Sequence, residues 1–355
     1  MPLKNDQAAQ LLEGRVLQGG WHVVEKIAPA AHQTGGVYSS YYKVENGDRK
    51  GFLKAFDYSA AARATNDFAI EINNITTAYN LERDILELCK ENGCRNIIQI
   101  LDKGFIDVPE AGQYPRVEYL ILEYAEKGNL RDVLSNNDVT LEWKIRSLHQ
   151  MAKGLSELHK LSIAHQDVKP SNIVQLSSGQ TKISDLGSAA PINGDQSRLP
   201  QRQLNHLSGT WEYAPPELLY GSIASDDNVR RIGCDLYLLG SMIAFYFTNM
   251  SMTALIKSNL SASLCWTIPT NYGNYDSFKA YVIEAFEKAI SDIAFQIENQ
   301  YLRDKVVETV RYLCHPDPLV RGHEKNIARR GSNYSLERFI SSFDLIARKL
   351  KLKKL

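Results

Sequence analysis

The first third of the chain is dominated by short apolar runs that have the length of β-strands. These runs are rich in Val, Tyr, Trp and Ile, residue types that fit a pleated, half-buried surface. Residues 57–90 depart from this pattern, because Leu81, Ile85, Leu88 and Cys89 follow the spacing of one helical face. We therefore expect a helix within 57–90 and strands over residues 21–27, 36–44, 51–56, 97–106 and 119–124.

After Gly128 the apolar residues take up helical spacing, most clearly over residues 143–161. A second helical stripe runs over 281–312 and includes Val282, Phe286 and Ile290. Core packing is the default role of such a stripe, and a groove for a partner is the alternative. A strand-rich part followed by a helical part predicts an α+β fold with two lobes.

The change of pattern places a hinge near residues 123–128. The expected organisation is a leader over 1–17, a β-rich lobe over 18–124, a helical lobe over 125–350 and a basic tail over 351–355. Lysines and arginines at 348–354 suit the end of a last helix, where cations face the negative end of the helix dipole. A lipid or RNA contact is the alternative for this basic segment.

One uncharged run, residues 236–256, has the length of a membrane span. It is interrupted by Ser241, Thr248, Asn249, Ser251 and Thr253, and such polar residues favour a buried helix that leads into a loop. We therefore expect no membrane span.

The bulk composition limits the function classes. The 41 basic and 41 acidic residues cancel, which argues against electrostatic binding of nucleic acid or of a membrane surface. The five cysteines have no regular spacing and indicate free thiols in a reducing compartment. Because the start of the chain is polar and has no apolar signal region, we expect a cytoplasmic protein.

The most informative segment lies in the helical part. Residues 165–172 read His-Gln-Asp-Val-Lys-Pro-Ser-Asn, and residues 184–187 read Ser-Asp-Leu-Gly. Phosphoryl transfer needs a carboxylate for a hydroxyl proton, a cation near the moving phosphate and oxygen ligands for Mg²⁺. Asp167, Lys169, Asn172 and Asp185 supply these parts in that order.

These two motifs resemble the catalytic loop and the metal loop of eukaryotic-type (Hanks-type) serine/threonine protein kinases. The resemblance implies that Asp167 accepts the substrate hydroxyl proton, Lys169 steadies the γ-phosphate, and Asn172 and Asp185 bind Mg²⁺. Gln166 and Leu186 replace the usual arginine and phenylalanine. The Ala-rich phosphate loop, Gln166 and Pro215 in place of alanine favour a divergent, microbial member.

Motifs farther along the chain match the same family in the same order. Residues 209–217 resemble the substrate-docking end of an activation segment, in which Thr210 contacts the catalytic loop. The resemblance implies a buried pair between Glu217 and Arg321, and a helix whose Asp235 anchors the catalytic loop backbone. It covers roughly residues 18–350.

The resemblance also extends into the strand-rich part. Lys54 matches the lysine that holds the α- and β-phosphates of ATP and is itself positioned by a glutamate on a helix. Glu82 and Asp84 are both candidates for that glutamate. Glu82 is favoured, because it precedes the apolar Leu86 by one helical turn.

Residues 122–125 resemble the hinge, where backbone groups of Glu123 and Ala125 bond the adenine edge. The nucleotide-binding residues implied are Gly35, Gly36, Val37, Phe52, Lys54, Leu122, Glu123, Ala125 and Val174.

Four departures from the family pattern are expected to matter. Pro29 and Ala30 stand where phosphate-binding loops carry glycines, and Phe52 stands where a small residue packs on adenine. Gln166 is neutral, whereas the usual arginine pairs with a phosphate on the activation loop, so we expect activity without phosphorylation there. The segment 245–310 is longer than usual, which suits either a partner surface or a structural connection.

The sequence thus predicts a kinase that uses ATP and Mg²⁺ to phosphorylate Ser or Thr hydroxyls of proteins, with the substrate unknown. One alternative is a pseudokinase scaffold, which Phe52 and the missing glycines favour. The other is a small-molecule kinase, which usually lacks the docking segment. A second metal site is not expected, because Cys314, His315 and His323 lack a fourth ligand.

Overall fold

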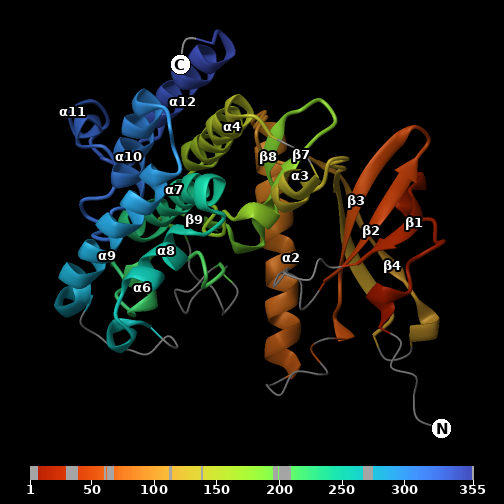
Figure 1. The fold of residues 1–355 in the computed structure, drawn as a ribbon. Coiled ribbons are helices and arrows are strands. Elements are labelled where there is room, and N and C mark those ends of the chain that lie inside the picture. The colour runs from red at the N-terminus through yellow and green to blue at the C-terminus, as the bar shows by residue number, and fades with distance from the viewer. Residues whose placement is uncertain are drawn as a thin grey trace.

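The computed structural model describes residues 7–28, 39–59, 61, 68–111, 114–136, 139–194, 199, 209–266 and 275–353. They form a sheet lobe and a helical lobe, and the long helix α2 (Phe68–Glu91) stands between them (Figure 1). The α+β, two-lobed architecture that the sequence predicts is confirmed.

The sheet lobe is built on one antiparallel sheet in the order β1-β2-β3-β5-β4. Its strands lie close to the predicted runs, although the fourth begins three residues later and the fifth three residues earlier than expected, and residues 36–38 of the second run lie outside the described residues. The strands are β1 (His22–Ile27), β2 (Ser39–Asn46), β3 (Arg49–Phe56), β4 (Ile100–Asp107) and β5 (Arg116–Glu123).

Each face of this sheet is covered differently. One face packs against α2, with Phe56, Leu120 and Leu122 among its buried side chains. The other face buries Tyr42 and Val44 under the segment that precedes β1, and Ala9 accepts a 2.8 Å hydrogen bond from the Tyr42 hydroxyl. Residues that we assigned to a leader, among them Ala8, Ala9, Leu12 and Leu17, therefore contribute to the core of the sheet lobe.

The helical lobe surrounds α7 (Gly233–Thr248), almost all of whose side chains are buried. The other helices are α3 (Leu130–Asn136), α4 (Leu141–Lys160), α6 (Pro216–Leu219), α8 (Met252–Asn259), α9 (Tyr275–Phe295), α10 (Gln300–Cys314), α11 (Ile327–Arg330) and α12 (Glu337–Lys351). Two small antiparallel sheets pair β6 (Ile163–Ala164) with β9 (Ala190–Pro191) and β7 (Ile173–Gln175) with β8 (Thr181–Ile183), and the second of them is a hairpin.

The uncharged run at 236–256 forms the end of α7, a turn and the start of α8. The turn occurs where Asn249 adopts a left-handed conformation (φ 58°) and its N–H bonds the carbonyl of Phe245, which ends the helix. Within the described residues no single helix is long and apolar enough to cross a membrane. The bent pair Asn228–Thr248 and Met252–Asn259, with an angle of 73°, meets that test by length and composition alone.

The helix expected over 57–90 is described as α2 over Phe68–Glu91, and residues 60 and 62–67 of that range lie outside the described residues. One helical expectation needs correction. The single stripe expected over 281–312 is broken into α9 and α10, because Asn299 caps a new helix by accepting a 2.9 Å hydrogen bond from the N–H of Leu302.

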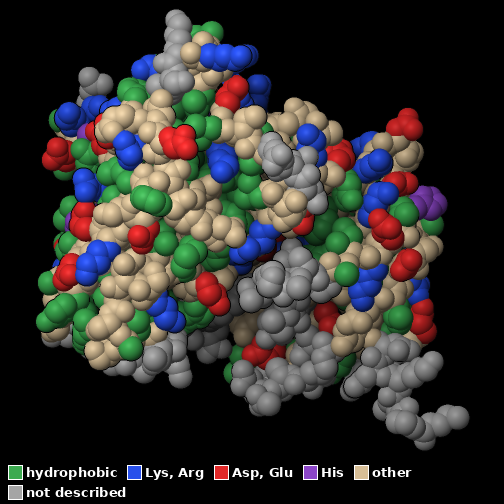
Figure 2. Space-filling view, viewed as in Figure 1, with side chains coloured by type: hydrophobic (Ala, Val, Ile, Leu, Met, Phe, Trp, Pro, Cys, Tyr) green, Lys and Arg blue, Asp and Glu red, His purple; other side chains and the backbone are tan. Residues whose placement is uncertain are grey.

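The molecular surface in view carries acidic and basic side chains interspersed over both lobes (Figure 2). This mixture agrees with the zero formal net charge of the chain.

Candidate active site

A cleft with a volume of about 1020 Å³, including the part open to solvent, lies between the two lobes. Its walls come from the sheet, the hinge after β5, α2, α3 and the loops around the β7–β8 hairpin. Predicted site residues that line it are Phe52, Lys54, Glu82, Leu122, Glu123, Ala125, Asn172, Val174 and Asp185. Gly35, Gly36 and Val37 lie outside the described residues.

Lys54 is the centre of a buried charge cluster at the inner end of the cleft. Its Nζ contacts both carboxylate oxygens of Glu82, at 2.9 and 2.8 Å, and Oδ1 of Asp185 at 3.0 Å. Asp84 instead pairs with Arg83 on the exposed side of α2. The structure therefore chooses Glu82 over Asp84, because Glu82 faces the lobe interface and Asp84 faces away from it.

The cluster keeps Lys54 and Asp185 in their charged states. Burial alone would lower the pKa of Lys54, but the charges of Asp185 and Glu82 outweigh burial and raise it. Burial alone would raise the pKa of Asp185, yet the charge and hydrogen bond of Lys54 hold it well below the usual range. A cation and a carboxylate thus coexist in a poorly hydrated place.

The catalytic loop orients Asp167 through both of its carboxylate oxygens. Oδ1 accepts a 2.9 Å hydrogen bond from the N–H of Thr210. Oδ2 lies 2.9 Å from Nζ of Lys169 and accepts a 2.9 Å hydrogen bond from the Asn172 side chain. The Thr210 hydroxyl also accepts a hydrogen bond from Lys169. Two motifs that lie far apart in the sequence, residues 165–172 and 209–217, therefore meet at one carboxylate.

Asp235 anchors the start of the catalytic loop through hydrogen bonds to the loop backbone. Its side chain, fully buried in α7, accepts hydrogen bonds from the backbone N–H groups of His165 (2.9 Å) and Gln166 (2.7 Å). It also lies 2.8 Å from the ring Nε2 of His159. This is the anchoring contact that the sequence resemblance implies.

The donor set at the cleft suits a hard divalent cation. Asp185 is ionised and borders the cleft, and Asn172, which points its amide nitrogen at Asp167, borders the same space. Carboxylate and amide oxygens are the ligands that Mg²⁺ prefers, usually together with phosphate and water. These two residues would hold the ion.

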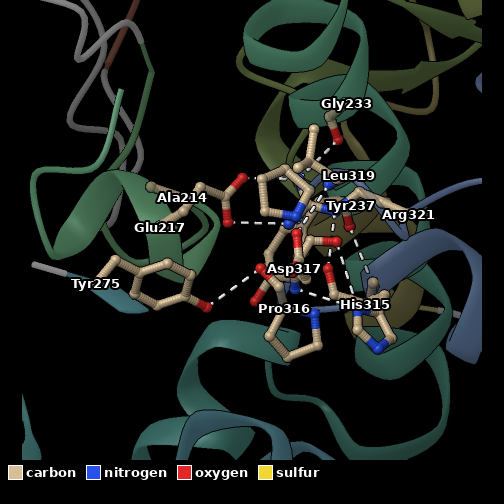
Figure 3. Close-up of polar contacts among 12 residues, drawn as sticks. Ala214, Glu217, Gly233, Tyr237, Tyr275, His315, Pro316, Asp317, Leu319 and Arg321 are labelled. Atoms are coloured by element: carbon tan, nitrogen blue, oxygen red, sulfur yellow. Dashed lines mark hydrogen bonds and ion pairs between the residues drawn. The ribbon is translucent and has the colours of Figure 1, made fainter. Parts of the chain in front are cut away.

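The docking segment is held by a buried ion pair in the helical lobe. Arg321 is completely buried and contacts both oxygens of Glu217, at 2.8 and 2.9 Å. Arg321 also donates to the carbonyls of Gly233 (3.0 Å) and His315 (3.0 Å) (Figure 3). The pair therefore joins α6, the start of α7 and the segment after α10.

The sequence profile described as protein kinase domain matches residues 48–317, which is most of the chain. The chain belongs to the protein kinase family. The match begins after β2, so it leaves out the segment where phosphate-binding loops carry their glycines.

Relatives within this family are distant in sequence. The chain is 26% identical over 224 residues to 3-phosphoinositide-dependent protein kinase 1 of Arabidopsis thaliana, covering 54% of this chain and 46% of that protein. It is 30% identical over 148 residues to a probable serine/threonine-protein kinase, PknB, of Bifidobacterium longum, covering 40% and 21%. It is 29% identical over 212 residues to cyclin-dependent kinase 9 of Xenopus tropicalis, covering 56% and 54%. The chain thus spans about half or less of the length of these relatives.

The kinase-like cleft contains residues that sequence reasoning missed. Tyr41 of β2 lines the cavity, and Lys182 of β8 lies 2.6 Å from the carboxylate of the hinge residue Glu123. Arg231, buried before α7, donates a 3.0 Å hydrogen bond to Gln166. Tyr41 comes to face the cleft beside Lys54 through the register between β2 and β3, and Lys182 and Arg231 likewise gave no local signal.

The Glu217–Arg321 pair predicts a large loss of stability when it is broken. Arg321→Met should lower the free energy of unfolding by about 3–5 kcal/mol, because it leaves the Glu217 carboxylate buried without its cation. Arg348→Met is the matched control, since Arg348 pairs with Asp344 at an exposed site, and should cost less than about 1 kcal/mol. Chemical denaturation of both variants measures the difference, and equal small losses would contradict the assignment.

Proposed function

We propose that this chain is an ATP- and Mg²⁺-dependent protein kinase that phosphorylates Ser or Thr hydroxyls of proteins. The observation that carries the proposal is the convergence of Lys54, Glu82 and Asp185 at one end of an open cleft, with Asp167, Lys169 and Thr210 beside it. A scaffold has no need to keep all these groups in contact.

Asp167 is the group placed to receive the substrate hydroxyl. Its carboxylate is oriented by Thr210, Lys169 and Asn172, so it would accept a hydrogen bond from a hydroxyl that approaches along the docking segment. Lys169 and Lys54 would offset the negative charge of the phosphates. Catalysis would therefore rest mainly on positioning and on charge neutralisation.

Asn172 and Asp185 would hold the Mg²⁺. When bound, the ion neutralises phosphate charge and orients the phosphate oxygens. The ion pair between Lys54 and Asp185 keeps the Asp185 carboxylate ionised before nucleotide arrives. The serine/threonine preference rests on Lys169 and Thr210, which contact each other as this class of kinase requires.

A pseudokinase scaffold is the second candidate, and one observation favours it. Phe52 and Tyr41 place two aromatic rings in the cleft where a small residue is usual. The cavity nevertheless stays open with both rings in it, which supports nucleotide binding.

We further propose that activity does not require phosphorylation of the activation segment. The side-chain amide of Gln166 donates a 3.0 Å hydrogen bond to the carbonyl of Ser188 and accepts a 3.0 Å hydrogen bond from Arg231. Asp227, an ion-pair partner of Arg231 at 3.5 Å, accepts the N–H of Asn193 at 2.9 Å. Neutral and internally paired groups thus tie the start of the segment to the helical lobe, a task for which other kinases use a phosphate and an arginine.

Transfer of label from γ-labelled ATP to a generic protein substrate tests the proposed activity. Asp167→Ala should lower kcat by about 10²–10⁴-fold, because the positioned proton acceptor is lost. Asp185→Ala should abolish Mg²⁺-dependent binding of ATP, measured as loss of the thermal shift that Mg-ATP gives the wild type. A wild type with neither label transfer nor thermal shift would establish the scaffold instead.

The choice of Glu82 over Asp84 predicts a difference between two similar variants. Glu82→Gln should lower kcat/KM for ATP by about tenfold or more, because Lys54 loses a charge-assisted partner. Asp84→Asn, a change of the same kind one half-turn away on α2, should leave kcat/KM within about twofold of wild type. Steady-state kinetics at varied ATP separates them, and equal losses would refute the pairing.

Phosphatase treatment tests the independence from phosphorylation. The treated enzyme should keep its rate within about twofold, because Gln166 and Arg231 hold the segment without a phosphate. Gln166→Ala should lower the rate by about tenfold, since it removes the hydrogen bonds that join the Ser188 carbonyl and Arg231 through this side chain. Gln180→Ala, which removes a hydrogen bond from an exposed amide, is the control. Loss of activity after phosphatase treatment would overturn the proposal.

A further inference from the structure

The roof of the cleft is built from three neighbouring strands of the sheet. Ile27 of β1 pairs with Tyr41 of β2, and Tyr41 pairs with Lys54 of β3. Phe52 lies two residues before Lys54, so strand alternation places its side chain on the same face. Ile27, Tyr41 and Phe52 all line the cavity, which gives the roof two aromatic rings next to the phosphate-binding lysine.

The two rings support each other. Tyr41 and Phe52 are stacked, with ring centroids 5.4 Å apart and ring planes 28° apart. Phe52 is also the register partner of Leu122, the last apolar residue before the hinge. Val174 of β7 lines the same cavity from the helical lobe. The cleft is therefore a slot with an aromatic roof, an aliphatic wall opposite, and the hinge along one edge.

The hinge offers few side-chain groups to a nucleotide base. The carboxylate of Glu123 is held by Lys182 at 2.6 Å, and the Glu123 N–H donates to the carbonyl of Gln99 at 2.8 Å. Leu122 and Ala125, the other predicted hinge contacts, carry no polar side-chain atoms. The predicted hinge contacts thus offer only backbone groups to the base edge, and the side chains of Tyr124, Asn129 and Asp132 line the cavity beyond them.

From this arrangement we propose that the nucleotide base stacks on the Tyr41–Phe52 pair, and that stacking supplies most of the base-binding energy. The inference rests on the proposed function and adds to it a base-binding role for Phe52, the residue that the sequence pattern placed as an obstacle in the cleft. Because every base has a π face, a site that relies on stacking discriminates weakly between bases. The expected enzyme therefore accepts GTP as well as ATP.

Tyr41 suits this position because its ring is uncharged at neutral pH. Burial raises the pKa of Tyr41 to about 12, even though the nearby charge of Lys54 acts in the opposite direction. A neutral phenol adds no negative charge beside the phosphates. Tyr41 therefore contributes the stacking surface of its ring and no charge.

Binding measurements on the full chain test the proposal with three probes: Mg-ATP, Mg-GTP and Mg-tripolyphosphate, which has phosphates but no base. Phe52→Leu keeps an apolar side chain of similar size and removes the ring. It should raise the Kd for ATP and for GTP by about tenfold or more and leave the Kd for tripolyphosphate unchanged. Wild type should bind ATP and GTP within about tenfold of each other.

Phe105→Leu is the matched control, because Phe105 lies on β4 of the same sheet, is 38% exposed and contacts Arg116 instead of the cleft. It should change none of the three Kd values. A second pair isolates the Tyr41 ring from its hydroxyl: Tyr41→Phe should keep the ATP affinity, and Tyr41→Leu should weaken it severalfold.

The outcomes distinguish the proposed stacking role from the proposed kinase function. Unchanged or tighter ATP binding by Phe52→Leu, or a wild type that prefers ATP over GTP by more than about a hundredfold, overturns the stacking role while the kinase function stands. A wild type that binds tripolyphosphate but neither nucleotide overturns both, because the roof then closes the base site.

Discussion

The buried carboxylate of Asp235 is the constraint on which the catalytic geometry depends. It receives the backbone N–H groups of His165 and Gln166, and it is inaccessible to solvent. Gln166 adopts a left-handed conformation (φ 64°), which is costly for a residue with a side chain. Two charge-assisted hydrogen bonds to one fixed carboxylate offset that cost. The turn they hold presents Asp167 to the cleft.

Charges elsewhere in the molecule follow the same rule, that a buried ion is kept only beside its partner. Lys54 lies between Glu82 and Asp185, and Arg321 lies against Glu217 with two carbonyls completing its hydrogen bonds. Lys182 meets Glu123 where the sheet ends. Each pair joins segments far apart in the chain, so the ion pairs fix the lobes and loops relative to one another as well as stabilising them.

The substitution of Gln166 for arginine gains a physical meaning in this setting. A neutral amide both donates and accepts, and it bridges the Ser188 carbonyl and Arg231. An arginine in its place could not accept a hydrogen bond and would face a second buried cation. Gln166 and Arg231 are therefore compatible as a pair, and their contacts support the proposal that the activation segment needs no phosphate.

The sequence by itself determined the order of elements and most of the candidate catalytic residues. Strand alternation, helical spacing and the 165–172 and 184–187 motifs are local patterns, and they identified Asp167, Lys169, Asn172 and Asp185. The sequence pattern did not predict the break between α9 and α10, because the apolar spacing continues across the Asn299 cap.

Only the tertiary structure decided the partners. Glu82 and Asp84 are both acids on one helix, and just the direction of that helix against β3 shows which one reaches Lys54. Arg231 and Lys182 carry no local signal, since their roles come from residues 65 and 59 positions away. From the sequence alone, Phe52 was expected to obstruct the nucleotide site. Its stacking on Tyr41 beside an open cavity appears only when β2 and β3 pair. A chain pattern specifies what each residue is and which face it takes, whereas contacts between distant segments exist only after the lobes pack together.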